Sequence, residues 1–188
     1  MGQPRWPEPV ILFCGLIAAG EAVLHRALEP LRARFGEILL RSAIFPFDFT
    51  DYYESEMGGG LVRQFVAFEE EIDPGCLAAI KLETNRLEQQ LAEEAGNVSQ
   101  RRTVNLDPGY VAPDKVVLAT TKNYAHRIYL SNGIYAEVTL NFGKGTVRTF
   151  EWTYPDYRTA MAAEFFLAVR RRVLEKRRQR KAARPGQE

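Results

Sequence analysis

The sequence has few of the residue types that support disulfide-stabilised, zinc-bound or membrane-spanning folds. Its 188 residues include two cysteines and two histidines, so neither a disulfide framework nor a Cys/His zinc cluster is expected. The longest apolar stretch, residues 10–19, has about half the length of a membrane-crossing helix, and no signal-peptide pattern surrounds it. We therefore predict a cytoplasmic protein with no membrane partner.

The sequence also lacks the common nucleotide-binding and hydrolytic motifs. It contains no GxGxxG, GxxxxGKS/T, HExxH or GxSxG segment. Each of these motifs places its key side chains or backbone groups within a few residues of one another. These common machineries are therefore absent at the level of the sequence.

The net charge of +1 at pH 7 conceals two parts of opposite sign. Residues 170–188 carry nine Lys or Arg and two Glu, so this tail has a charge of +7 and the remaining residues have −6. An acidic body does not attract polyanions over its whole surface, so any RNA contact would have to use the basic tail or a local patch. We predict a flexible arm over residues 1–9, one α+β domain over 10–169, and a basic helical tail over 170–188.

Hydrophobic periodicity predicts the order of the elements. They are a strand at 10–15, a helix at 21–35, strands at 38–44 and 61–68, a helix beginning at Asp73, and a strand at 103–106. This is the order of a ferredoxin-like split βαβ sandwich of the α+β class. Pro30 has no backbone N–H, so we expect it to kink or restart the first helix. A C-terminal β-hairpin at Asn132-Gly133 and a C-terminal helix from about Asp156 would extend the sandwich.

The first candidate site is FPFDFTDYYESEMGGG, residues 45–60, where acidic and aromatic side chains are interleaved. Asp48, Asp51 and Glu54 could hold a hard cation such as Mg²⁺ through oxygen ligands, and the glycines would let the loop close over a ligand. The alternative is an irregular loop that is pinned by its aromatic rings, since the spacing matches no defined metal-binding loop.

The second candidate is NLDPGY, residues 105–110. Asp107-Pro108-Gly109 is primarily a turn sequence, and a turn is the simpler interpretation. A carboxylate at the end of a central strand is also where mixed α/β domains expose site residues. Asp107 is therefore a candidate base, and Tyr110 a candidate contact for a ligand.

The third candidate is TTKNYAHRIYL, residues 120–130, which concentrates donors and cations suited to a phosphate or a carboxylate. His126 precedes a predicted strand and lies beside Arg127, so it could act as a general acid or base. A lone histidine without a paired nucleophile or ligand is weak evidence for catalysis, and the alternative is a residue with no catalytic role. In the next strand, 134–141, Glu137 lies on the polar face.

These three blocks and two further segments resemble a bacterial family known as domain of unknown function 4416. The likeness runs from about Val10 to Val169 and rests on FPFDFTDYYESEMG, EIDPGCLAAIKLETNRLE, RTVNLDPGYV, LATTKNYAHRIYLSNGIYAEVTL and WTYPDYR. The resemblance implies a small intracellular bacterial protein, and the family has no established activity to carry over. The basic tail lies outside the matching region.

The leading functional hypothesis is a small enzyme or ligand-binding domain that takes a phosphorylated or carboxylated metabolite, with Mg²⁺ as the candidate cofactor. The candidate acid–base residues are His126, Asp107 and Asp51. The candidate ligand-binding residues are Lys122, Arg127, Tyr110, Thr121, Tyr129 and Glu137, and the candidate metal ligands are Asp48, Asp51 and Glu54. Two alternatives remain: an RNA-binding or ribosome-associated module that uses the basic tail, although no RNP1-like run is found, and a structural or interaction protein.

Overall fold

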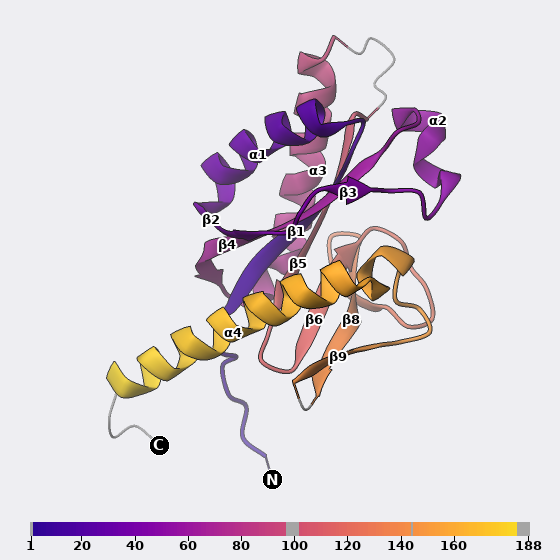
Figure 1. The fold of residues 1–188 in the computed structure, drawn as a ribbon. Coiled ribbons are helices and arrows are strands. Elements are labelled where there is room, and N and C mark those ends of the chain that lie inside the picture. Colours follow the sequence, from indigo (N-terminus) through magenta and orange to yellow (C-terminus); the bar gives the residue numbers. More distant parts are fainter. Residues whose placement is uncertain (1, 97–101, 144, 184–188) are drawn as a thin grey trace.

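The computed structural model describes residues 2–96, 102–143 and 145–183 (Figure 1). Its α-helices are α1 (Glu21–Phe35), α2 (Glu54–Met57), α3 (Leu77–Glu94) and α4 (Ala160–Ala183). Its 3-10 turns are η1 (Asp51–Tyr53), η2 (Pro74–Cys76) and η3 (Pro155–Arg158). Its strands are β1 (Val10–Ala18), β2 (Ile38–Arg41), β3 (Phe45–Pro46), β4 (Val62–Ile72), β5 (Val104–Val111), β6 (Lys115–Thr120), β7 (Ile128–Ser131), β8 (Ile134–Gly143) and β9 (Thr146–Thr149). The predicted α+β class is confirmed.

The strands form one large antiparallel sheet. Their order is β2-β4-β1-β5-β6-β8-β7, and in addition β3 pairs with β4 and β9 pairs with β8. Strand β1 is central, because it pairs with β4 on one side and with β5 on the other. Its sequence VILFCGLIA is buried along its whole length, as expected for a strand that is covered on both faces.

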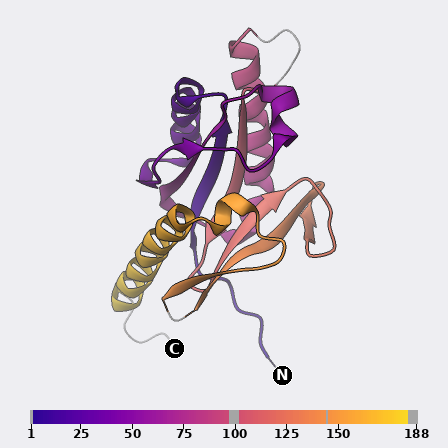
Figure 2. The same ribbon diagram turned by 45° about the vertical axis from the view of Figure 1, so that its right-hand side comes forward.

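Helices cover both faces of this sheet (Figures 1 and 2). Helices α1 and α3 lie on one face, where Leu24 and Leu87 share a core with Leu16 of β1. Helix α4 crosses the opposite face, and its Phe166 packs edge-on against Phe13 of β1 with the ring centroids 5.0 Å apart. The central strands are therefore removed from water on both sides.

Helix α1 runs through Pro30 without interruption, so the helix does not restart there, and the other predicted outcome, a kink, stays a prediction. A proline inside a helix costs about 3 kcal/mol. Leu28 and Leu31 flank it and are both buried in the core beneath α1. Burying each leucine contributes about 1.5–3 kcal/mol, which offsets the cost of the proline.

The hairpin predicted at Asn132-Gly133 is confirmed. The two residues join β7 to β8 with φ angles of 52° and 76°, the left-handed values that a two-residue turn of this kind requires. The start signal at Asp73 also works as predicted, since its carboxylate accepts the N–H of Gly75 at 2.7 Å just before α3.

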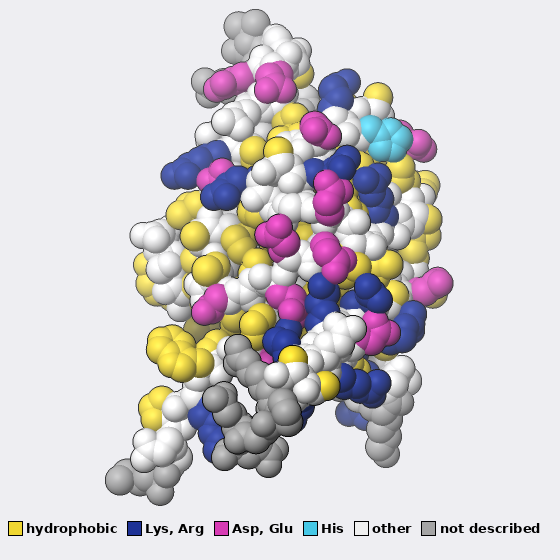
Figure 3. Space-filling model, turned by 90° about the vertical axis from the view of Figure 1, so that its left-hand side faces the viewer, with side chains coloured by type: hydrophobic (Ala, Val, Ile, Leu, Met, Phe, Trp, Pro, Cys, Tyr) yellow, Lys and Arg dark blue, Asp and Glu magenta, His cyan; other side chains and the backbone are white. Residues whose placement is uncertain are grey.

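The basic tail continues α4 to Ala183, and residues 184–188 of the predicted tail lie outside the described residues. Lys176 lies 2.6 Å from Glu69, and Arg180 forms an ion pair with Glu71. Figure 3 shows Lys and Arg side chains around this end of the molecule with acidic side chains among them. Part of the tail's charge is therefore balanced by the body. No helix among the described residues combines the length and the apolar character needed to cross a membrane.

Candidate functional site

A deep cleft opens where β5 and β6 separate. The two strands pair only through residues 109–111 and 116–118. The earlier part of β5 runs beside β1 alone, and the later part of β6 runs beside β8. The cleft has a volume of about 1090 Å³. All three sequence blocks contribute to its lining, together with α3 and the segment that leads into α4.

The predicted turn at Asp107-Pro108-Gly109 is wrong, because these residues lie within β5. Pro108 has no N–H to donate, and it lies just before the point at which β5 gains β6 as a neighbour. A Cβ atom on Gly109 would lie 2.3 Å from the carbonyl oxygen of Val117, so only glycine lets β6 approach at this point. The pairing of β5 with β6 therefore begins at Gly109, and Pro108 is the last residue of β5 before that pairing.

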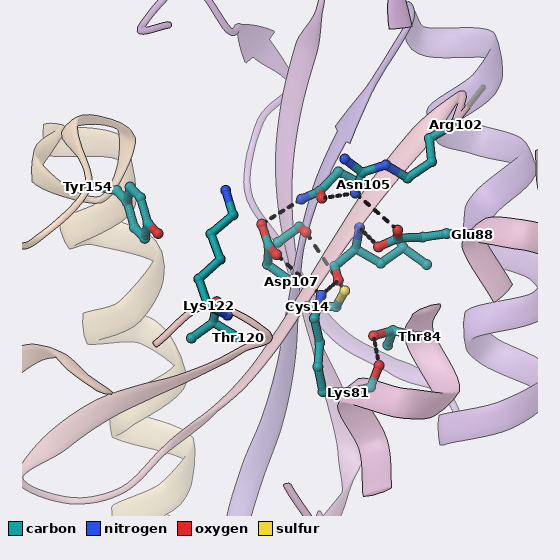
Figure 4. Close-up of polar contacts among 12 residues, drawn as sticks. Cys14, Lys81, Thr84, Glu88, Arg102, Asn105, Asp107, Thr120, Lys122 and Tyr154 are labelled. Atoms are coloured by element: carbon teal, nitrogen blue, oxygen red, sulfur yellow. Dashed lines mark hydrogen bonds and ion pairs between the residues drawn. The ribbon is translucent and has the colours of Figure 1, made fainter. Parts of the chain in front are cut away.

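Side chains of α3 replace the missing strand along the open edge of β5 (Figure 4). Glu88 accepts the backbone N–H of Leu106 at 2.7 Å, and the ammonium group of Lys81 donates to the Leu106 carbonyl at 2.7 Å. Lys81 and Glu88 are 5% and 4% exposed. Buried backbone groups have to be hydrogen-bonded, and these two charged side chains satisfy that requirement where β6 does not.

A buried arginine forms the floor of the cleft. Arg63 on β4 is 1% exposed, with its Nη2 atom 3.0 Å from Asp156 and its Nη1 atom 3.8 Å from Asp107. The guanidinium also lies over the rings of Phe65 and Tyr157, 4.7 and 5.4 Å from their centroids. Among the described residues, its Nε and Nη1 atoms have no hydrogen-bond partner. Two donors of a buried cation are therefore unfilled.

A glycine on the neighbouring strand makes room for this arginine. Gly15 of β1 pairs with Phe65 of β4 on one side and with Asp107 of β5 on the other. A Cβ atom on Gly15 would lie 2.5 Å from Nη2 of Arg63 and 2.9 Å from its Cζ atom. The guanidinium therefore occupies the space that any other residue at position 15 would fill.

Asp107 is the centre of a chain of polar contacts that lines the cleft (Figure 4). Asn105 donates to its carboxylate at 2.6 Å, and Lys81 lies 3.4 Å from its other oxygen. Arg102 in turn donates to Asn105 at 3.0 Å and lies 3.4 Å from Glu88. These contacts engage both oxygens of Asp107 and fix the position of its carboxylate.

A second polar cluster forms another part of the lining. Arg127 donates to the Glu137 carboxylate at 2.7 Å, to the carbonyl of Lys122 at 2.9 Å and to the hydroxyl of Tyr154 at 2.8 Å. The Nε2 atom of His126 lies 3.1 Å from the same Glu137 oxygen. Glu137 is almost completely buried, so it orients Arg127 and His126 from behind the surface of the cleft.

Burial raises the pKa of two carboxyl groups at the site. For Asp156, burial is the largest cause of the raised pKa, and the Asp107 charge adds to it while Arg63 opposes it. For Glu88, burial again raises the pKa and Lys81 opposes the change. A carboxyl group that holds its proton to a higher pH inside a cleft is a candidate proton donor.

The cleft brings together five of the residues predicted from sequence. These are Asp107, Thr121, Lys122, His126 and Arg127. Glu137 lies behind them, as described above. Tyr110 and Tyr129 are not brought to the cleft: Tyr110 packs against the core at the start of α3, and Tyr129 contacts the ring of Tyr135 on β8.

The acidic side chains that were predicted to bind Mg²⁺ do not line the main cleft, although aromatic residues of the same loop do. Asp48, Asp51 and Glu54 line a small pocket of about 200 Å³, and Asp51 does not line the main cleft. Across residues 2–96, 102–143 and 145–183, no three His, Cys, Asp or Glu side chains are arranged so that they could hold a metal ion. Magnesium binding by this loop stays a prediction.

Sequence reasoning missed most of the floor of the cleft. Arg63 interrupts an apolar strand, and Lys81 and Glu88 lie seven residues apart on the apolar face of α3. Charged residues are seldom buried unless they are paired, so their place within a buried pattern is the signal that could have found them. Asp156 carries no such signal, because only the tertiary fold brings it to Arg63.

The comparisons with known proteins identify a family but no activity. No curated protein and no solved structure matches this chain. A family model with the description "Domain of unknown function (DUF4416)" matches residues 8–173, a range that includes every segment lining the cleft. Because this range covers most of the sequence, the chain belongs to the DUF4416 family.

Proposed function

We propose that this protein is a small enzyme or ligand-binding domain that takes an anionic metabolite, bearing a phosphate or carboxylate group, into the cleft. The observation that carries the proposal is the guanidinium of Arg63, which is buried at the floor with Nε and Nη1 unpartnered among the described residues. Both donor atoms are themselves buried, so an anion in the cleft would reach them only when the side chains around Arg63 move apart.

Unfilled donors on a buried cation are costly. An unsatisfied buried polar group costs about 1–3 kcal/mol, and more when the group is charged. Asp156 and Asp107 balance the charge of Arg63, but they leave part of its hydrogen-bonding capacity unused. Phosphate and carboxylate oxygens match the geometry of guanidinium donors, so an anionic ligand would remove this cost.

Lys122 adds a cation without a fixed acidic partner. Its ammonium group lies 4.0 Å from the ring centroid of Tyr52, and within the described part of the chain it forms no ion pair. Figure 4 shows its side chain extended between Tyr154 and Asp107 in that view. An exposed cation in this position would meet an anion that enters the cleft before the anion reaches Arg63.

The site also holds groups that could move a proton. His126 is oriented by Glu137, and Asp156 has a raised pKa beside the Asp107 carboxylate. In an enzyme, the acid–base groups would be His126 and Asp107, the two of our three sequence candidates that line the cleft, with Asp156 as a further proton donor. In a binding protein the same groups would only orient the ligand.

Calorimetric titration and thermal unfolding with inorganic phosphate, glucose 6-phosphate and citrate test the proposal. A ligand that binds only the folded state raises its stability by about 2.7 kcal/mol at one hundred times Kd. We expect at least one of these anions to raise the unfolding temperature, and Lys122→Met to weaken its binding. The matched control is Lys115→Met, which removes a lysine outside the cleft and should leave binding unchanged. If none of the anions binds, or if Lys122→Met binds as tightly as the wild type, the proposal is wrong.

The arrangement of strands and helices in the first half of the domain favours a small ligand over RNA. Strands β2-β4-β1-β5, with α1 and α3 on one face, have the order of a ferredoxin-like sandwich, which we infer for this half of the domain. RNA-binding modules of that kind use the opposite face of the sheet. Here α4 covers that face, and Phe13 and Phe65 are buried beneath it.

RNA binding through the basic tail stays a prediction. A cytoplasmic location also stays a prediction.

A further inference from the structure

Exposed aromatic side chains gather around the cleft. Five of the large apolar side chains that remain exposed also line it: Phe49, Tyr52, Tyr124, Trp152 and Tyr154. Tyr52 and Tyr124 are the most exposed of the five, at 54% and 56%. Contiguous exposed apolar surface with a polar surround is characteristic of binding sites. The mouth of the cleft is therefore aromatic, whereas its floor is charged.

Two of these rings, Trp152 and Tyr124, belong to a parallel series that also includes Phe150 and His126. Phe150 stacks on Trp152 with centroids 4.8 Å apart and planes 2° apart, and Trp152 stacks on His126 at 5.1 Å and 11°. His126 is parallel to Tyr124 at 6.2 Å and 3°. The indole N–H of Trp152 donates to the carbonyl of Val138 at 3.0 Å and ties the series to β8. The series ends at Tyr124, whose ring is more than half exposed.

A cation lies over the ring of each of the two most exposed tyrosines of the lining, Tyr52 and Tyr124. The guanidinium carbon of Arg127 lies 4.6 Å from the centroid of Tyr124, and the ammonium group of Lys122 lies 4.0 Å from that of Tyr52. A ring that is fixed in this way loses little further freedom when a planar group stacks on it. The same cleft therefore contains exposed tyrosine rings and, at its floor, hydrogen-bond donors of Arg63 that have no partner among the described residues.

From this arrangement we infer that the anionic ligand of the cleft is a nucleoside phosphate. This inference rests on the proposed function and names its ligand class. The phosphate would meet Lys122 and the floor donors of Arg63, and the planar base would stack on Tyr124, the exposed end of the parallel series. The cleft volume of about 1090 Å³ slightly exceeds the usual range for small-molecule pockets, roughly 300–1,000 Å³, and a simple sugar phosphate would leave much of it empty.

Stacking would recognise the shape of the base more than its identity, because every base has a flat face. Loss of one base–aromatic contact lowers affinity by roughly tenfold or more. We therefore expect nucleoside monophosphates to bind at least about tenfold more tightly than ribose 5-phosphate, which carries the anion without the ring.

The experiment compares AMP, GMP, CMP and UMP with ribose 5-phosphate and adenosine by calorimetric titration of the full chain. Tyr124→Ala should remove most of the advantage of the monophosphates and leave the affinity for ribose 5-phosphate unchanged. Tyr129→Ala is the matched control, since Tyr129 is similarly exposed at 58% but lies on β7 outside the cleft lining. We expect this control to bind every probe as the wild type does.

The outcomes separate this inference from the proposed function. If ribose 5-phosphate binds as tightly as the monophosphates and Tyr124→Ala changes neither, the nucleoside phosphate is refuted while anion binding stands. If adenosine binds as tightly as AMP and no anion binds alone, both proposals fail, because the phosphate then contributes nothing. If a single-stranded oligonucleotide binds far more tightly than every monophosphate and still binds Tyr124→Ala, the ligand is a polymer held elsewhere and the inference is wrong.

Discussion

Replacing Gly15 by alanine tests how firmly the protein holds Arg63. The added methyl carbon would lie 2.5 Å from Nη2 and 2.9 Å from Cζ of that arginine. Ordinary contacts between heavy atoms are near 3.5 Å, so the guanidinium would have to withdraw by about 1 Å. Such a shift would disturb its 3.0 Å contact with Asp156. Overpacking of this kind in a filled interior costs about 1–3 kcal/mol.

Urea denaturation of the wild type and of Gly15→Ala measures this cost, and Gly59→Ala is the control. A Cβ atom on Gly59 meets nothing within 4 Å, so the control should keep or slightly gain stability. We also expect Gly15→Ala to bind anions more weakly, because Arg63 no longer occupies its place on the floor. A Gly15→Ala protein with the stability and anion affinity of the wild type would refute the reasoning.

Three further changes probe the buried charges. Arg127→Met should cost about 3–5 kcal/mol in urea denaturation, because it leaves the buried Glu137 carboxylate short of its main partner, and adding Glu137→Gln should recover part of the loss. Lys81→Met should cost about 1–3 kcal/mol by the same assay, since the Leu106 carbonyl then has no donor. Because burial raises the pKa of Asp156, this carboxyl contributes stability that is present below about pH 4 and is lost as the pH rises through the raised pKa. The wild type should therefore lose stability relative to Asp156→Asn as the pH rises from about 4 through this raised pKa, and a relative gain over that rise would contradict the assignment.

Several helices, strands and turns could be predicted from short sequence patterns, because each depends on interactions among neighbouring residues. The apolar strand at the centre of the sheet, the cap at Asp73 and the turn at Asn132-Gly133 each depend on a few neighbouring residues. The interpretation of Asp107-Pro108-Gly109 as a turn failed for the opposite reason. Its residues have turn propensity, but the pairing with β1 keeps them extended, and Gly109 serves a close approach to β6.

The candidate site was predictable only in part. The cations and the histidine of residues 120–130 follow one another in the chain, so their concentration is visible in the sequence. Arg63 and Asp156 are far apart in the chain and meet only when α4 docks on the sheet. Asp51 was grouped with the cleft on sequence alone, and the η1 turn that contains it places it in a separate small pocket.

A crystal structure of the protein with a bound phosphate compound tests the central claim most directly. The account predicts the anion inside the cleft, with an oxygen within hydrogen-bond distance of Nε or Nη1 of Arg63 and near the ammonium group of Lys122. An anion bound only at the arginines of α4, with the donors of Arg63 still unfilled, would contradict it.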